Sequence, residues 1–265
     1  MKKTKIIIVA MIVTLLLVSS MSASAAGHSI SAKEVIQSKR GVHLKITNAS
    51  TLTWGKIYRP GGELITVEDF NVGMNGLAQA YDEETNISAA YTFNKASGKL
   101  FNGINSSSAR ALPNGISLEH RNLQAAGQLI PMNESASAMG STDTQINFIP
   151  RTNNDYTMVR LEVSISYYLM ISATEDYMGQ NNVNIQYYDD YNMGNWTFQL
   201  NDGIYLPQAG YESINDTYSF FVDVPSGTHC HASIGTDGAS GSIQQGFVSG
   251  MSQSLADISM TITVK

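Results

Sequence analysis

The segment Val159–Ile171 reads Val-Arg-Leu-Glu-Val-Ser-Ile-Ser-Tyr-Tyr-Leu-Met-Ile. Apolar side chains occupy every second position of its first part, and polar residues stand between them: Arg160, Glu162, Ser164 and Ser166. A β-strand places successive side chains on opposite faces, so this stretch predicts a strand with one buried and one wet face. Its length exceeds that of an ordinary strand, which predicts a bend or a bulge within it.

Shorter stretches with the same alternation extend this reading over the chain. They are Val42–Ile46, Val183–Tyr187, Trp196–Leu200, Tyr218–Val224 and Ala256–Val264. Turn-forming residues separate them, at Pro60-Gly61-Gly62, Pro113-Asn114-Gly115, Asn201-Asp202-Gly203 and Pro225-Ser226-Gly227. Several strands with regular turn signals predict an all-β fold, an antiparallel sandwich or barrel.

Three segments fit the strand pattern less well. Leu123–Ala138 is compatible with a short helix near its start, which Gly127 would limit. Gly238–Gly241 is rich in glycine and serine and predicts a flexible loop. The polar residues 150–155 mark the best boundary if the chain has two subdomains, although we expect a single domain over residues 41–265.

The N-terminal 25 residues have the features of a secretory signal. Three lysines precede the apolar run Ile6–Val18, and Ala23-Ser24-Ala25 has the small-x-small pattern of a signal-peptide cleavage site. The run is shorter than the roughly 20 residues that span a bilayer, which disfavours a retained anchor. We therefore expect cleavage after Ala25, a polar leader over residues 26–40, and export to the cell surface or the medium, with membrane contact only during export.

Charge and cysteine content narrow the classes of function. Removing residues 1–25 from the 265 leaves 240, with 13 basic and 22 acidic side chains and a net charge of −9. This acidity argues against nucleic-acid binding, which needs clustered cations. The only cysteine, Cys230, cannot form an internal disulfide, and we expect a buried thiol.

The sequence offers weak candidates for metal binding and catalysis. His229 and His231 would share one strand face and Cys230 the other, which predicts two surface histidines beside a core cysteine. Paired carboxylates such as Asp189-Asp190 lack the spacing of a cation loop or a glycosidase pair. We expect no metal, no cofactor and no enzymatic activity.

The tyrosines are the remaining candidates for a binding surface. Consecutive tyrosines on a strand place one ring on each face, and the outer ring serves either sheet packing or ligand binding. The segment Tyr187–Trp196 concentrates aromatic, amide and acidic residues around a turn. Its candidate ligand-binding residues are Tyr187, Tyr188, Asp189, Tyr191 and Trp196.

Two segments carry a resemblance to a known family: the leader Ser29–Ile36 and the alternating C-terminal stretch Leu255–Val264. With the export signal and the acidic all-β chain, they resemble bacterial fimbrial subunits and surface adhesins of the chaperone–usher type. The resemblance implies an immunoglobulin-like or pilin-like β-sandwich completed by the leader of a neighbouring subunit, with a periplasmic chaperone and other fimbrial subunits as partners. It implies these subunit contacts: Ile30, Ala32, Ile36, Ile258, Met260 and Ile262. Glu34 interrupts the leader's alternation, and Lys265 stands where the family commonly ends in an aromatic residue.

The preferred interpretation is an exported structural or adhesive surface protein that self-associates or binds a host or matrix ligand. Two alternatives stay open. The Ser/Thr alternation over Ser242–Val264 is compatible with a secreted β-pore-forming toxin, and a secreted hydrolase with an unrecognised site is the other.

Overall fold

A computed structural model gives the fold of the chain. It describes residues 28–29, 35–37, 41–58, 64–72, 78–79, 92–94, 99–133, 137–154, 157–192, 198–242 and 247–265. Strands dominate these ranges, none of which contains a helix, and so no helix there is long and apolar enough to cross a membrane. The predicted signal and the predicted turn at Pro60-Gly61-Gly62 lie outside the described residues.

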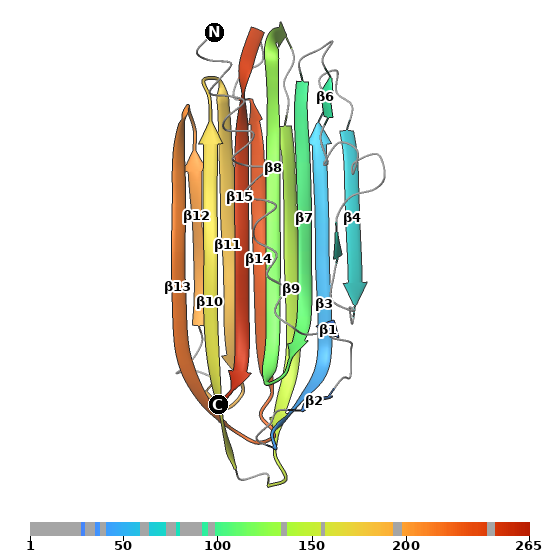
Figure 1. The fold of residues 1–265 in the computed structure, drawn as a ribbon, viewed down its shortest axis with the longest axis vertical. Coiled ribbons are helices and arrows are strands. Elements are labelled where there is room, and N and C mark those ends of the chain that lie inside the picture. The colour runs from blue at the N-terminus through green and yellow to red at the C-terminus, as the bar shows by residue number, and fades with distance from the viewer. Residues whose placement is uncertain are drawn as a thin grey trace.

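Two antiparallel sheets form a β-sandwich, as the alternation predicted. In the described part of the chain, sheet A has the order β1 (His28–Ser29), β7 (Lys99–Leu112), β8 (Gly115–Asn133), β15 (Phe247–Val264), β10 (Met158–Ala173) and β13 (Gly210–Pro225), with β5 (Ala78–Gln79) and β6 (Thr92–Asn94) also on β7. Sheet B has the order β12 (Phe198–Leu206), β11 (Tyr177–Asp189), β14 (Cys230–Ser242), β9 (Ser137–Arg151), β3 (His43–Tyr58) and β2 (Val35–Gln37), with β4 (Leu64–Val72) also on β3. Figure 1 shows the long strands running along the longest axis of the molecule.

The strand β10, which contains Val159–Ile171, keeps a continuous register with both of its neighbours. It pairs with β13 on one side and with β15 on the other, without a register shift in either ladder. The predicted bulge within it is therefore wrong. Shifts occur elsewhere, between Ile46 and Asn48 in β3 and between Val248 and Gly250 in β15. A long strand stays regular here because both of its edges are hydrogen-bonded over most of its length.

One half of the space between the sheets is an apolar core. The alternation places the apolar members of β10 and β15 inside, and Leu161, Val163 and Ile262 are fully or almost fully buried. Strands β3, β9, β11 and β14 contribute the facing side chains, among them Ile46 and Ile185. Each such side chain contributes about 1.5–3 kcal/mol by burial, so this half of the interior supplies most of the driving force for folding.

Buried polar side chains of β8, β9, β11 and β14 form a second part of the described interior. His120 of β8 lies between the sheets, with Nε2 2.7 Å from Thr144 Oγ1 and Nδ1 2.9 Å from Thr142 Oγ1. Asn122 donates to the carbonyl oxygen of Gly140, and Asn181 donates to the carbonyl oxygens of Met170 and Leu255. These bonds compensate the loss of water that burial imposes on polar groups.

Two of the three segments that fit the strand pattern least well are nevertheless strands where the structure describes them. Residues 123–133 belong to β8, so the helix alternative is wrong, and Gly238–Gly241 belong to β14 rather than to a loop. The predicted turn at Asn201-Asp202-Gly203 lies inside β12. In each case pairing with neighbouring strands overrides the local preference of glycine and asparagine for turns.

The other described turn signals act as predicted. Pro113 and Asn114 form the two-residue connection of the β7–β8 hairpin, and β13 ends at Pro225 before a turn at Ser226-Gly227. Pro150 and Arg151 end β9, and residues 152–154 lie between β9 and β10. Both sheets combine strands from before and after this segment.

Candidate functional site

A polar groove crosses the outer face of sheet B. It has a volume of about 730 Å³ and lies across β12, β11, β14 and β9. Its outward-facing side chains include Asn182, Asn184 and Gln186 of β11, which alternate with the buried residues of that strand. The same alternation that builds the core therefore also builds the groove, with amide groups on the wet face.

The strand register arranges these side chains in rows across the sheet. One row contains Gln199, Gln186, Ser233 and Gln145, the next contains Asn201, Asn184, Gly235 and Asp143, and the third contains Gly203, Asn182, Asp237 and Ser141. The three rows span roughly 13 Å between the outer members along a strand, and the four strands about 14 Å across. An area of this size presents many hydrogen-bond donors and acceptors to one ligand.

Glycines give the groove its depth. Gly235 stands in the middle of a row, and a Cβ built there would lie 3.5 Å from Asp143 Oδ1, an ordinary contact. The absence of a side chain at Gly235 therefore leaves space rather than relieving a clash. Gly203 differs, because a Cβ there would collide with the Asn182 side chain. Gly203 is therefore needed for the position of Asn182.

Carboxylates dominate the charge of the groove. Among the described residues that line it are Asp143, Asp202 and Asp237, and no lysine, arginine or histidine. Burial raises the pKa of Asp143, the hydrogen bond from Gln145 Nε2 to its Oδ2 (2.7 Å) lowers it, and the charge of Asp237 raises it again. The carboxylate of Asp202 lies on the other side of the strand, because Asp202 pairs with the buried Val183. It accepts bonds from the Tyr167 hydroxyl of sheet A (2.6 Å) and from the Gly203 amide (2.8 Å), so the charges that face the groove are those of Asp143 and Asp237.

Aromatic rings lie on the same face beyond the rows of amides. Tyr205 of β12 lines the groove and is mostly exposed. Tyr188, two residues beyond Gln186 on β11, is 41% exposed and stacks on His231 with ring centroids 4.6 Å apart. His231 Nδ1 lies 2.7 Å from Asn147 Oδ1, and burial lowers the pKa of its imidazole. The face thus combines amides, carboxylates and exposed rings.

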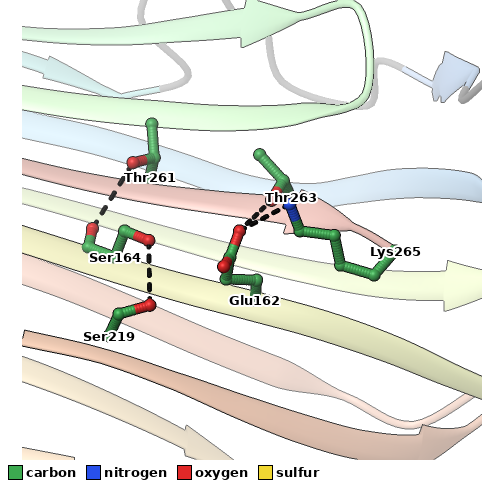
Figure 2. Close-up of polar contacts among 6 residues, drawn as sticks. All are labelled: Glu162, Ser164, Ser219, Thr261, Thr263 and Lys265. Atoms are coloured by element: carbon green, nitrogen blue, oxygen red, sulfur yellow. Dashed lines mark hydrogen bonds and ion pairs between the residues drawn. The ribbon is translucent and has the colours of Figure 1, made fainter.

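The outer face of sheet A is different, because its hydroxyls bond to neighbours within the sheet. Ser164 Oγ lies 3.3 Å from Ser219 Oγ, and Thr261 donates to the Ser164 carbonyl at 3.4 Å (Figure 2). Glu162 accepts from Thr263 at 3.4 Å and pairs with Lys265 at 2.6 Å (Figure 2). The polar groups of this region satisfy one another, which leaves the groove of sheet B as the better candidate site.

The predicted ligand-binding residues do not form one surface. Tyr187 and Asp189 are fully buried, so their assignment to a ligand surface is wrong. Asp189 instead accepts the Asn192 amide at 2.7 Å and fixes the turn after β11. Tyr188 and Tyr191 are exposed, at 41% and 58%, whereas Trp196 lies outside the described residues. Only Tyr188 of the described set shares the face of the groove.

The predicted subunit contacts of the C-terminal strand lie inside the chain's own core. Ile258, Met260 and Ile262 are buried on β15, which pairs with both β8 and β10. Ile36 is buried on β2, which pairs with β3 of the same chain. The prediction that these four residues contact another subunit is therefore wrong, because the chain's own core already covers their side chains. Ile30 and Ala32 lie outside the described residues.

The predicted arrangement around the cysteine is confirmed. Cys230 is a buried free thiol, while His229 is exposed and His231 is partly exposed. Within the described ranges, no three histidine, cysteine or acidic side chains gather as metal ligands would.

Sequence reasoning missed the groove, although one signal for it was present. In β11 the polar positions carry amides rather than the mixed charges of an ordinary solvated face, at Asn182, Asn184 and Gln186. Nothing in the sequence indicated that β9, β12 and β14 would align their polar residues beside them. That alignment depends on the order of strands in sheet B.

Comparisons with known proteins give only distant likenesses. No protein-family model and no curated protein matches the chain. Among solved structures, an isomalto-dextranase of Arthrobacter globiformis T6 complexed with panose has a TM-score of 0.15 and 9% identity, covering 82% of this chain and 35% of its own. A carbohydrate-binding module of the β-sandwich superfamily has a TM-score of 0.15 and 6% identity, and the match covers 91% of this chain and 96% of the module. The structure of infectious bursal disease virus strain Gx has a TM-score of 0.13 and 9% identity, and the match covers 83% of this chain and 64% of the viral chain. At these TM-scores they carry no argument about this chain.

Proposed function

We propose that the protein is an exported adhesive surface protein that binds a glycan in the groove of sheet B. The observation that carries the proposal is the row pattern of amide and carboxylate side chains on one exposed sheet face. Amides both donate and accept hydrogen bonds, and carboxylates accept them, which suits a ligand covered with hydroxyl groups. The basic, apolar and small-residue order of residues 1–25 supports export.

The rings on the same face support a saccharide over other polar ligands. Tyr205 and Tyr188 present exposed aromatic surface beside the amides, and such rings combine an apolar face with a polar tip. A sugar ring offers the matching combination of an apolar face and peripheral hydroxyls. The volume of about 730 Å³ is within the range of ligand pockets.

The test is a glycan array probed with the mature chain and two matched variants. Gly235→Leu fills the middle of the groove, and Ala239→Leu places the same side chain on the outer face of the same strand, outside the groove lining. We expect binding to at least one glycan, with affinity reduced at least tenfold by Gly235→Leu and retained by Ala239→Leu.

Circular dichroism and thermal unfolding of both variants establish that they are folded. Equal binding by a folded Gly235→Leu variant would place the ligand elsewhere and contradict the proposal. An array with no bound glycan at all would contradict it as well.

A further inference from the structure

The charge of the groove indicates which glycan it selects. Asp143 stands on β9 and Asp237 on β14, in adjacent rows of neighbouring strands, because Asp143 pairs with Gly235 and Asp237 pairs with Ser141. Side chains in this diagonal relation are roughly 7–8 Å apart at the backbone, and the charge of Asp237 acts on Asp143. The groove thus places two like charges close together.

The space between the carboxylates is open because of Gly235. Asp143 Oδ2 accepts the bond from Gln145, and Asp143 Oδ1 faces the volume above Gly235. An alanine-sized group would contact Oδ1 at an ordinary distance. A small cationic group therefore has room to lie beside Asp143, within reach of the field of Asp237.

We propose that the groove selects a glycan that carries protonated amino groups, a polymer of amino sugars, and that one ammonium group lies between Asp143 and Asp237. This inference rests on the proposed glycan binding in the groove. An ammonium group donates hydrogen bonds to both carboxylates and removes their mutual repulsion, and such charge-assisted bonds are the stronger kind. The absence of cations from the described lining residues disfavours glycans with carboxylate or sulfate groups.

The mature chain is acidic as a whole, so a polycation would also bind it without a specific site. Binding in the groove differs from binding by overall charge because it depends on where a carboxylate lies. Asp216 is exposed on β13, in the other sheet, and offers a matched carboxylate away from the groove. Asp143→Asn and Asp237→Asn change the net charge by the same amount as Asp216→Asn, so a difference between them reports the groove and not the total charge.

The experiment measures binding of three oligosaccharides of equal length by calorimetry: a glucosamine hexamer, its N-acetylated form and a uronic acid hexamer. We expect the glucosamine hexamer to bind at least about tenfold more tightly than the N-acetylated form, and the uronic acid hexamer not to bind. Asp143→Asn and Asp237→Asn should remove this preference, whereas Asp216→Asn should keep it.

The outcomes separate this inference from the function on which it rests. Equal affinity for the glucosamine and N-acetylglucosamine hexamers, both sensitive to Gly235→Leu, would overturn the charge selection and leave glycan binding in place. A preference that Asp216→Asn weakens as much as Asp143→Asn would reduce the effect to overall charge and also overturn it. Failure of all three hexamers to bind, while the array detects another glycan in the groove, overturns the inference alone.

Discussion

At the scale of single residues, the buried polar groups have the most definite chemical consequences. His120 and Cys230 are both inside the sandwich and both titratable. Burial lowers the pKa of His120 to about 3 and raises the pKa of Cys230 to about 12. Each residue is therefore held in its neutral form over the physiological range, and each gives a measurable effect when the solution conditions change.

His120 should make the protein lose stability in acid. The unfolded chain binds a proton on this histidine near pH 6.5 and the folded chain only near pH 3, so protons favour the unfolded state between those values. The free energy of unfolding should fall by up to about 1.4 kcal/mol for each pH unit below 6.5. Urea unfolding of the wild type and of His120→Gln, from pH 7 to pH 4, measures the two slopes. Identical slopes would show that His120 does not titrate as described.

Cys230 should be unreactive while the protein is folded. Burial raises the pKa of its thiol, the charges of Asp189 and Asp190 raise it further, and Tyr187 opposes them, so the reactive thiolate is scarce. We expect an aromatic disulfide reagent at pH 8 to modify less than a tenth of Cys230 in the time that suffices for complete modification in denaturant. Rapid modification of the native chain would contradict the burial of this thiol.

At the scale of elements, β14 shows how one strand serves two environments. Its inward positions pass from the apolar core at Cys230 and Ile234 to the polar interior at Gly238 and Ser240, and its outward positions form the middle of the groove. Gly235 and Gly238 point to opposite sides of the sheet. The two glycines therefore respond differently to the same substitution.

Gly238→Ala should destabilise the fold and Gly235→Ala should not. A Cβ at Gly238 would lie 2.7 Å from Asn181 Oδ1 and 2.9 Å from Asn122 Oδ1, and both asparagines are buried and bonded to backbone carbonyls. Neither can shift without losing a hydrogen bond, so the expected cost is about 1–3 kcal/mol. Chemical denaturation of both variants gives the comparison, and equal stability of the two would argue against the tight polar interior.

The same strands show how far the sequence determines the fold and the site. Alternation predicted the buried faces of β10 and β15 because each apolar residue there has polar neighbours on both sides over much of the strand. The alternation also placed Tyr187 on the buried side of β11 with Val183 and Ile185, although the aromatic and polar composition of the segment Tyr187–Trp196 suggested a ligand surface. Alternation within single strands was not enough to predict the groove, because the rows of the groove arise from pairing between strands that are distant in the chain. Glycines such as Gly238, which indicate turns locally, are required in β14 by side chains from other strands.

At the scale of the whole molecule, the side of the sandwich at β12 and β13 is closed by aromatic and acidic side chains. Among the described strands, β13 pairs only with β10 and β12 only with β11. Phe198 of β12 stacks on Phe220 of β13 with centroids 5.1 Å apart. The hydroxyl of Tyr167 in sheet A donates to Asp202 in sheet B. These contacts join the two sheets at their margin.

An inward-facing charge lies on β13, which forms an edge of sheet A among the described strands. Asp216 stands opposite Tyr167 in the register, on the side of the strand that faces sheet B, and a charge in this position opposes the addition of a further strand. We expect Asp216→Val to increase self-association in light scattering after size exclusion. Thr217→Val, on the other face of the same strand, should leave the mass unchanged. Unchanged mass in both variants would contradict this role for Asp216.

If a glycan binds the outer face of sheet B, it contacts the side-chain amides of the groove, and the resonances of these amides report the contact. The mature chain labelled with nitrogen-15 is titrated with a glucosamine hexamer and, separately, with an N-acetylglucosamine hexamer and the array glycan that binds most tightly. We predict that the side-chain amide signals of Asn184, Gln186 and Asn201 shift with the bound saccharide, while that of Asn215 on β13 does not. Shifts confined to Asn215 and its surroundings, or no shift of the groove amides with any of the three saccharides, would contradict glycan binding in the groove.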